Sequence, residues 1–275
     1  MVNILLGGNR KVFGDTLILV ASMADKTEEA LNITYLTIHI PQFEPKGLPL
    51  TKEHARFLDS LVKKKNPTSR FKLVDATEQF CAAGLTSGKN FPGHFSPYSN
   101  IRLIADKILG LPDRVIYLDN DIILNGDIKE FWDFNIEKYE VGVVKDDFRP
   151  FWSKYYNAGV MLMNLKRIRA SKMFERVIHM NRTRKLMYPN QTPLNRFTRK
   201  TKRMLPRKFN AKSKYYPEIV IHHICNVREG RFFLIGKWWH RIKPSETELL
   251  RKKLPAYIKY FDLLDQTRIA RPELF

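Results

Sequence analysis

Short apolar runs and amphipathic helical patterns alternate along the first half of this chain. Residues 2–8 form an apolar run ending in two glycines, and apolar side chains then recur at the helical i, i+3, i+4, i+7 spacing over residues 17–24. The order repeats, with apolar runs at 33–40, 71–74 and 114–118 and helical patterns at 51–65 and 101–108. Because parallel strands need helical connections, this alternation predicts an α/β fold with a mostly parallel central sheet flanked by helices.

The second half of the chain continues this pattern less regularly. Its apolar stretches predict strands at 139–144, 159–163 and 218–224 and a helix over 174–181, whereas the charged residues 196–214 are predicted to be loop-rich. Residues 245–264 predict a helix interrupted at Pro255. We therefore predict one domain over residues 1–244 and a basic, amphipathic helical tail over residues 245–275.

The positive charge of the chain is concentrated in one stretch. The 275 residues carry a formal net charge of +20 at pH 7, yet residues 1–164 hold 20 basic and 20 acidic side chains. Residues 165–214 hold 17 basic side chains and one acidic side chain, Glu175. This basic segment, residues 165–214, favours an anionic partner, which could be nucleic acid, an acidic acceptor or a membrane surface.

Composition and cysteine content exclude several other classes of protein. With 44% hydrophobic residues the chain can form a packed core, which excludes general disorder. Its apolar runs are far shorter than the roughly 18 to 20 residues that a membrane-spanning helix needs. Cys81 and Cys225 lie far apart without C-x-x-C spacing, so neither a disulfide framework nor a structural zinc site is expected. Together with an N-terminus that lacks the pattern of an export signal, these features predict a cytoplasmic protein.

Two carboxylates follow the predicted strand at 114–118. Asp119 and Asp121 flank Asn120, and in an extended segment the side chains at i and i+2 project the same way. Ligands of open α/β sheets bind outside the carboxyl ends of strands, where two such acids can hold one divalent cation and, through it, a diphosphate. The alternative is that the two acids only cap a turn at the end of the strand.

Adjacent histidines near the end of the predicted strand at 218–224 provide a further candidate ligand. Alternation along a strand directs His222 and His223 to opposite faces, so at most one of them points at a metal. Two carboxylates and one imidazole suit Mn²⁺ or Mg²⁺ better than they suit a zinc tetrad. The alternative is a hydrogen-bonded structural histidine.

Three segments carry motifs in a fixed order along the chain. They are residues 114–127, which contain Asp119-Asn120-Asp121, residues 156–165 with the sequence YNAGVMLMNL, and His223-Ile-Cys225 followed by residues 236–240 with the sequence GKWWH. In order and spacing, over residues 2–240, these motifs resemble the family eight glycosyltransferases, the group containing glycogenin and bacterial lipopolysaccharide galactosyltransferases.

The resemblance implies a retaining nucleotide-sugar transferase of the GT-A fold, with a Rossmann-like central sheet and a UDP-sugar as donor. It implies Asp119, Asp121 and His223 as ligands of Mn²⁺ or Mg²⁺, which would neutralise the diphosphate and stabilise the departing nucleoside diphosphate. It also implies a set of residues that bind the donor: Gly7, Gly8, Asn9, Arg102, Asn120, Asn157, Ala158 and Lys237. Lys237 matches the lysine of the family's Lys-Pro-Trp motif, although Trp238 replaces the proline.

The chain departs from the family pattern near the implied site of sugar transfer. Asn190 and Thr192 stand where family members usually carry two acids, so the implied catalytic residues are Asn190, Gln191 and Asp146. Gln191 is expected beside the anomeric carbon, and Asp146 matches a family acid near the sugar. Apart from the metal ligands and Asp146, no carboxylate is an obvious nucleophile. This favours attack by the acceptor hydroxyl on the same face of the sugar from which the leaving group departs.

The expected function is therefore transfer of galactose or glucose from UDP-galactose or UDP-glucose to a hydroxyl of a glycan or glycolipid, such as lipopolysaccharide or another cell-surface polysaccharide. The basic segment is expected to face an acidic acceptor or the inner face of the cytoplasmic membrane, where the chain would attach peripherally. The replacements at Asn190 and Thr192 leave open a catalytically weak or inactive membrane-surface homologue. A nucleic-acid-binding protein is the less favoured alternative.

Overall fold

The structure is a computed structural model that describes residues 1–91, 93, 96–146, 154–212, 215–224 and 244–275. Within this part of the chain, a central seven-stranded sheet has the order β3-β2-β1-β4-β7-β6-β8. Its strands are β1 Val2–Gly7, β2 Leu31–Thr37, β3 Arg70–Asp75, β4 Arg114–Leu118, β6 Val141–Lys145, β7 Tyr156–Asn164 and β8 Lys202–Leu205. Strand β7 is antiparallel to β4 and β6, and the other neighbouring pairs are parallel. The predicted mostly parallel sheet is confirmed.

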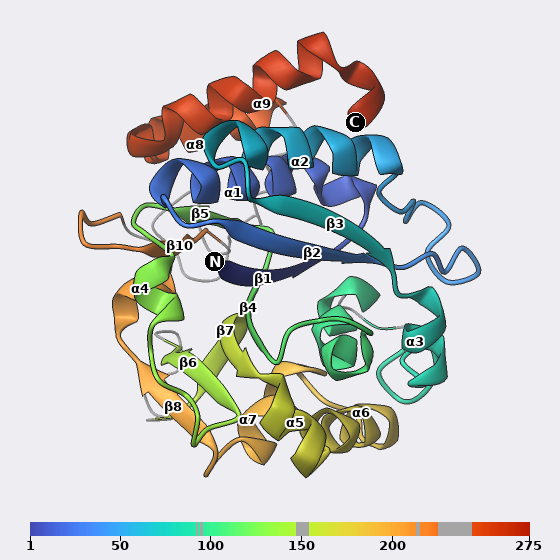
Figure 1. The fold of residues 1–275 in the computed structure, drawn as a ribbon. Coiled ribbons are helices and arrows are strands. Elements are labelled where there is room, and N and C mark those ends of the chain that lie inside the picture. The colour runs from blue at the N-terminus through green and yellow to red at the C-terminus, as the bar shows by residue number, and fades with distance from the viewer. Residues whose placement is uncertain (92, 94–95, 147–153, 213–214, 225–243) are drawn as a thin grey trace.

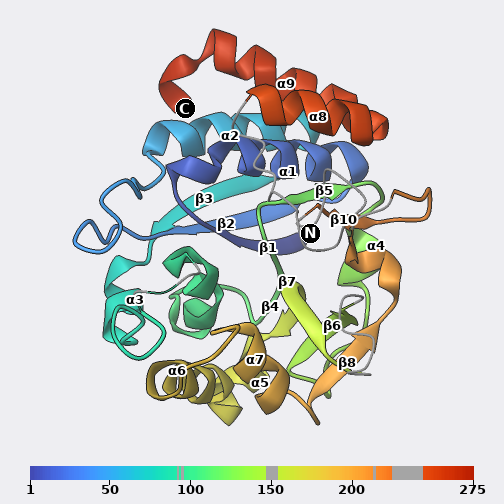
Figure 2. The same ribbon diagram turned by 180° about the vertical axis from the view of Figure 1, so that it is seen from behind.

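Helices cover both faces of this sheet (Figures 1 and 2). One face carries α1 Phe13–Lys26 and α2 Lys52–Lys65, with α8 Pro244–Lys253 and α9 Ile258–Ala270 stacked outside them. The other face carries α3 Thr77–Ala82, the 3₁₀ segment η2 Pro97–Lys107, α5 Leu165–Ser171, α6 Met173–Thr183 and α7 Gln191–Phe197. The remaining short elements are η1 Arg10–Val12, α4 Lys129–Trp132, η3 Arg207–Phe209, η4 Pro255–Tyr257 and η5 Pro272–Leu274.

Successive side chains of the central strands enter two separate apolar cores. Leu6 and Leu118 belong to the core beneath α1 and α2, whereas Leu5 and Tyr117 belong to the core beneath η2 and α6. This division follows from the alternation of side chains along a strand, and it explains why the strands read as continuous apolar runs.

A second, smaller sheet lies beside the carboxyl end of β4. It has the order β5-β10-β9, formed by β5 Ile122–Leu124, β10 Ile221–His223 and β9 Ala211–Lys212. Strand β10 is antiparallel to β5, so that His223 pairs with Ile122. This pairing places His223 next to the short turn between β4 and β5, which contains Asp119 and Asp121.

Two local predictions were wrong. Residues 196–214 are not mainly loop, because β8 adds a parallel edge strand beside β6 and β9 joins the smaller sheet. Three of the four residues of β8 are partly exposed and two are cationic, as is common at a sheet edge, so no apolar run marks the strand. The helix predicted at 101–108 is a 3₁₀ segment instead, and its apolar spacing suits either helix type.

The C-terminal residues pack onto the main domain in the described structure. Tyr260, Phe261 and Leu264 of α9 are buried in the same core as α1, and the helix is interrupted after α8 as predicted. Arg251 forms ion pairs with Asp262 and Asp265, so a part of the tail's positive charge is already compensated. Among the described residues, no helix combines the length and apolar character that crossing a membrane requires.

Candidate active site

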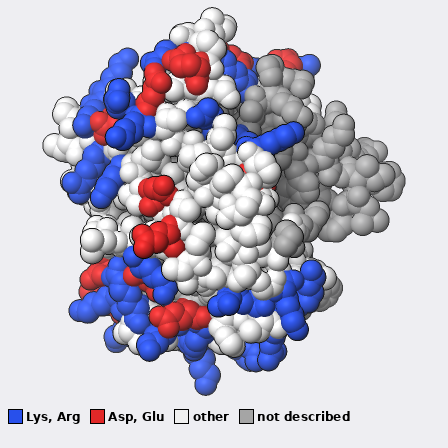
Figure 3. All heavy atoms as spheres, turned by 90° about the vertical axis from the view of Figure 1, so that its right-hand side faces the viewer, with Lys and Arg blue, Asp and Glu red and all other residues white. Residues whose placement is uncertain are grey.

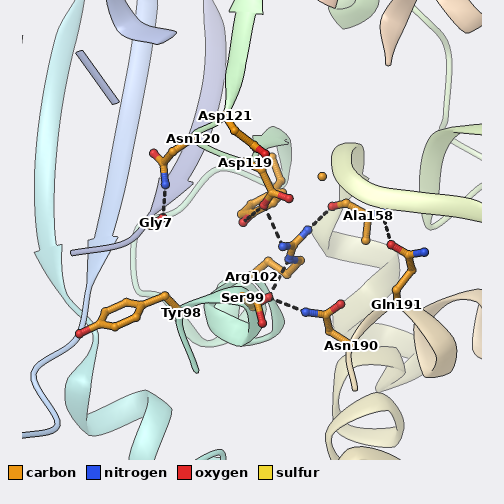
Figure 4. A network of polar contacts seen from close by, with 12 residues as sticks. Gly7, Tyr98, Ser99, Arg102, Asp119, Asn120, Asp121, Ala158, Asn190 and Gln191 are labelled. Atoms are coloured by element: carbon orange, nitrogen blue, oxygen red, sulfur yellow. Dashed lines mark hydrogen bonds and ion pairs between the residues drawn. The ribbon is translucent and has the colours of Figure 1, made fainter. Parts of the chain in front are cut away.

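The turn between β4 and β5 and the end of β10 bring three candidate metal ligands together (Figure 4 shows the two acids). One ligand atom from each of Asp119, Asp121 and His223 lies within 4.8 Å of the others. His223 Nε2 is 3.1 Å from Asp121 Oδ1. Two carboxylates and a neutral imidazole form a mixed oxygen and nitrogen donor set that fits a divalent cation such as Mn²⁺. The structure therefore brings together all three residues that the sequence nominated as ligands.

The two histidines of β10 point to opposite sides, as the alternation predicts. His223 Nδ1 lies 3.0 Å from Asn210 Oδ1, an arrangement that leaves Nε2 facing Asp121. His222 is fully buried on the other side, with its Nδ1 3.0 Å from the hydroxyl of Tyr257. Burial, together with the neighbouring His223, lowers the pKa of His222 to about 4, so it is a neutral structural residue.

Gly159 of β7 leaves space for two of the candidate metal ligands, His223 and Asp119. A Cβ atom at this position would lie 2.4 Å from His223 Cε1 and 2.7 Å from Asp119 Oδ2. In addition, the Asp119 backbone N–H donates to the Gly159 carbonyl at 2.8 Å. The glycine of the Asn-Ala-Gly sequence is thus required for the close approach of β7 to Asp119 and His223.

Arg102 of η2 lies behind Asp119, where it is 3% exposed. Its Nη2 donates to Asp119 Oδ1 at 2.8 Å, and other nitrogens of its guanidinium group donate to the Ala158 and Ser99 carbonyls (Figure 4). Burial, the largest single influence, would lower the pKa of Arg102, but the charge and hydrogen bond of Asp119, together with the smaller effects of Tyr117 and Asp121, outweigh it and the pKa is raised. Arg102 therefore holds Asp119 in place, in addition to any contact with a donor.

The two glycines at the end of β1 lie against the turn between β4 and β5. Asn120 Nδ2 donates to the Gly7 carbonyl at 2.8 Å, and Asn120 Oδ1 accepts from Thr16 Oγ1 at 2.9 Å. A Cβ atom on Gly8 would lie 2.6 Å from the Tyr35 hydroxyl, so the loop sits tightly on β2. Asn9 is 5% exposed, and its Oδ1 accepts from the Lys11 backbone N–H at the start of η1.

Gln191 and Asn157 face each other at the start of β7. Gln191 Oε1 accepts from Asn157 Nδ2 at 3.2 Å and from the Ala158 N–H at 3.4 Å. Asn190 Nδ2 donates to the Ser99 carbonyl at 2.9 Å, the carbonyl that also accepts from Arg102. The predicted pair Asn190 and Gln191 is thus connected to the metal-binding residues through η2 and β7 (Figure 4).

Asp146 at the end of β6 forms a buried ion pair that the sequence did not predict. Lys212 Nζ lies 2.8 Å from Asp146 Oδ1, and the two side chains are 3% and 7% exposed. Lys212 pairs in register with His223, so both side chains lie on one face of the smaller sheet. In the sequence, Lys212 is marked only as one of the many cations of residues 165–214, and nothing there indicates its pairing with Asp146. Lys237 lies outside the described residues.

Comparison with known proteins identifies the family. A model of glycosyl transferase family 8 matches residues 3–229. The chain belongs to glycosyl transferase family 8. This confirms the family resemblance, although residues 236–240 of the third motif lie beyond the matched residues.

Relatives of this family 8 chain include two enzymes of lipopolysaccharide synthesis. The chain is 30% identical to a lipopolysaccharide 1,2-glucosyltransferase of Escherichia coli over 125 residues, which are 40% of this chain and 37% of that protein. It is 30% identical to a lipopolysaccharide 1,3-galactosyltransferase of Salmonella typhimurium over 126 residues, 39% of this chain and 37% of that one. The matches thus span little more than a third of each relative's length.

The fold matches that of solved glycosyltransferases. The crystal structure of the galactosyltransferase LgtC in complex with donor and acceptor sugar analogs superposes with a TM-score of 0.65, at 16% identity, over 92% of this chain and 96% of that one. The GT-A architecture expected from the sequence is thereby confirmed.

Proposed function

We propose that this family 8 protein transfers a hexose, galactose or glucose, from a UDP-sugar to a hydroxyl group of a glycan or glycolipid, with retention of anomeric configuration. The observation that carries the proposal is the convergence of Asp119, Asp121 and His223 beside the Asn157 and Gln191 pair. The relatives named for lipopolysaccharide glucosyl and galactosyl transfer support a lipopolysaccharide-like acceptor and either hexose.

Each group of residues has a distinct task in this proposal. Asp119, Asp121 and His223 would hold Mn²⁺ or Mg²⁺, which supplies positive charge to a bound diphosphate. Arg102 and Asn210 orient two of the three ligands through their hydrogen bonds. Gly7 and Gly8 allow the backbone after β1 to approach the nucleotide, and Asn157 binds hydroxyls of the donor sugar.

The transfer step follows from the lack of a free carboxylate beside Gln191 in the described structure. Asp146 is paired with Lys212, and Gln191 is a weak nucleophile, so a covalent intermediate on either is not favoured. The acceptor oxygen instead bonds to the anomeric carbon as the bond to the phosphate oxygen breaks on the same face. The acceptor proton passes to the departing phosphate, while the Gln191 amide stabilises positive charge on the sugar.

A panel of UDP-sugars tests the proposal without knowledge of the acceptor, because slow transfer to water releases UDP. We expect Mn²⁺-dependent release of UDP from UDP-galactose or UDP-glucose, and loss of this activity on removal of the metal. UDP release that persists unchanged without metal would contradict the metal-centred site. If no donor releases UDP, the second candidate function is favoured, a catalytically inactive homologue. The replacement of two family acids by Asn190 and Thr192 supports this alternative.

We further propose that the exposed cations of α5 and α6 attach the protein peripherally to an anionic membrane surface. Figure 3 shows Lys and Arg side chains gathered at the lower end of the molecule, the end at which α5 and α6 lie in Figure 1. The exposed cations of these helices and of the residue between them are Lys166, Arg167, Lys172, Arg176 and Arg182. Each contributes about 1 kcal/mol near an anionic surface. Sedimentation with vesicles tests this: equal binding to anionic and neutral vesicles at low salt would contradict it.

A further inference from the structure

Lys202 of β8 extends its ammonium group to the start of β7, where no carboxylate of the described residues forms an ion pair with it. Lys202 Nζ donates to the Lys154 carbonyl, lies 3.5 Å from Asn195 Oδ1, and sits 4.9 Å from the centre of the Tyr156 ring. All three groups are neutral acceptors. Within the described part of the chain, no acidic side chain forms an ion pair with Lys202, Lys154 or Arg199.

The surroundings of Lys202 disfavour its own charge. Its side chain is partly buried, and the cations of Lys154 and Arg199 repel it. Burial, followed by these two like charges, lowers the pKa of Lys202 to about 8.

The position of Lys202 connects it to the residues expected to contact the sugars. The side chain of Asn195 bonds to the Tyr156 backbone twice, because its Oδ1 accepts from the N–H and its Nδ2 donates to the carbonyl. The same Nδ2 donates to the backbone carbonyl of Gln191 at 2.9 Å. Tyr156 immediately precedes Asn157, whose side chain donates to Gln191. Lys202 itself pairs in register with Val141, at the other end of β6, but its ammonium group reaches Asn195, which contacts the backbone of both Tyr156 and Gln191.

We propose that Lys202, Lys154 and Arg199 form a subsite for an anionic substituent, a phosphate or carboxylate, on the acceptor. An anion at this place would satisfy three cations that have no acidic partner among the described residues, and it would lie beside an acceptor hydroxyl held near Gln191. The subsite would make the protein select acidic acceptors over neutral ones. The assignment of the anion to the acceptor rests on the proposed function, whereas the binding of an anion does not.

Competitive acetylation of the native protein, read by mass spectrometry, tests the subsite without donor, metal or turnover. The rate of Lys202 acetylation at pH 8 is measured relative to that of the exposed Lys200 in the same sample. The probes are inorganic phosphate, glucose 6-phosphate and glucuronate, with methyl glucoside and potassium chloride at matched ionic strength as neutral and screening controls. Comparison of the two phosphate probes with glucuronate shows whether a phosphate or a carboxylate is preferred.

We expect an anionic probe to raise the Lys202 pKa from about 8 to about 9, and so to slow its acetylation at pH 8 about fivefold, while Lys200 is unaffected. Arg199→Gln, which removes an exposed charge, should largely abolish this protection, whereas the equally exposed Arg167→Gln on α5 should keep it. Equal rates with and without every anion, or equal protection by methyl glucoside, would overturn the subsite. Protection in a protein that releases no UDP from any donor would keep the anion site and remove only its assignment to a transferase acceptor.

Discussion

Gly159 and His223 approach so closely that a methyl group on the glycine would lie 2.4 Å from His223 Cε1. The same methyl group would lie 2.7 Å from Asp119 Oδ2, so the small residue of β7 serves two of the three candidate ligands at once. The signature around Asn157 and the acids after β4, which lie far apart in the sequence, are therefore parts of one site.

Gly159→Ala should separate the metal-binding residues without unfolding the sheet. Contacts this short force His223 or Asp119 to move, and we expect Mn²⁺ affinity to fall at least about tenfold, a loss typical of disturbed ligand positions. Mn²⁺ titration followed by electron paramagnetic resonance measures it. Gly110→Ala is the control, because Gly110 has φ +75° and no neighbouring atoms within 4 Å. The Gly110→Ala variant should lose about 1 kcal/mol of stability and keep its Mn²⁺ affinity. An equal loss of Mn²⁺ affinity in both variants would refute the prediction.

Gln191→Ala should reduce turnover more than donor binding. Removing one group that stabilises developing charge lowers kcat by about 100-fold in comparable sites, and the KM for the donor should change by less than about threefold. Steady-state kinetics of UDP release measure both constants. Gln266→Ala on the exposed side of α9 serves as the matched control and should behave as the wild type. Near-normal turnover of Gln191→Ala would remove Gln191 from the mechanism.

Asp146 and Lys212 should be strongly coupled in stability. Removing one partner of a buried pair leaves the other charge uncompensated, so Asp146→Asn and Lys212→Met should each cost about 3–5 kcal/mol. The double variant should be less destabilised than the sum, by about 2–3 kcal/mol. Urea denaturation of the four proteins gives this coupling. The exposed pair Lys129 and Asp133 should give only about 0.3–0.5 kcal/mol, and similar coupling in the two cycles would show that burial does not matter.

His54 should make the attachment of the C-terminus sensitive to pH. Its Nδ1 accepts from the Thr51 backbone N–H at 3.2 Å, so its Nε2 carries the proton and donates to the Leu274 carbonyl at 2.9 Å. Burial lowers the pKa of His54 below its ordinary value. The unfolded chain therefore binds this proton more readily, and the stability from neutral His54 is complete above about pH 6.5 and decreases as the pH falls toward the folded-state pKa.

The variant His54→Gln isolates this contribution. At pH 7.5 it should be less stable by about 1–2 kcal/mol, because a buried hydrogen bond to Leu274 is lost. Between pH 7.5 and 5.5 the wild type should lose more stability than the variant, so that the difference between them narrows. Urea denaturation at the two pH values measures this, and a difference that widens toward pH 5.5 would contradict the lowered pKa.

The sequence predicted the parts of the site that follow from strand ends. Asp119, Asp121 and His223 lie after or at the ends of apolar runs, and the carboxyl ends of strands meet at one edge of the molecule. Lys212 could not be predicted, because its partner Asp146 is 66 residues away and no local period connects them. Likewise, the role of Arg102 behind Asp119 depends on the packing of η2 against β4, which apolar spacing alone does not encode. Strand β8 was not predicted because it forms through pairing with β6, whereas its own side chains show no strand pattern.

Calorimetric titration of UDP in the presence and absence of Mn²⁺ tests the central claim, that Asp119, Asp121 and His223 form a metal site for a nucleoside diphosphate. The account predicts that Mn²⁺ increases the affinity for UDP by at least about 100-fold, about 2.7 kcal/mol, and that Asp121→Asn removes most of this gain. UDP affinity that is independent of Mn²⁺, or a gain that survives unchanged in Asp121→Asn, would contradict it.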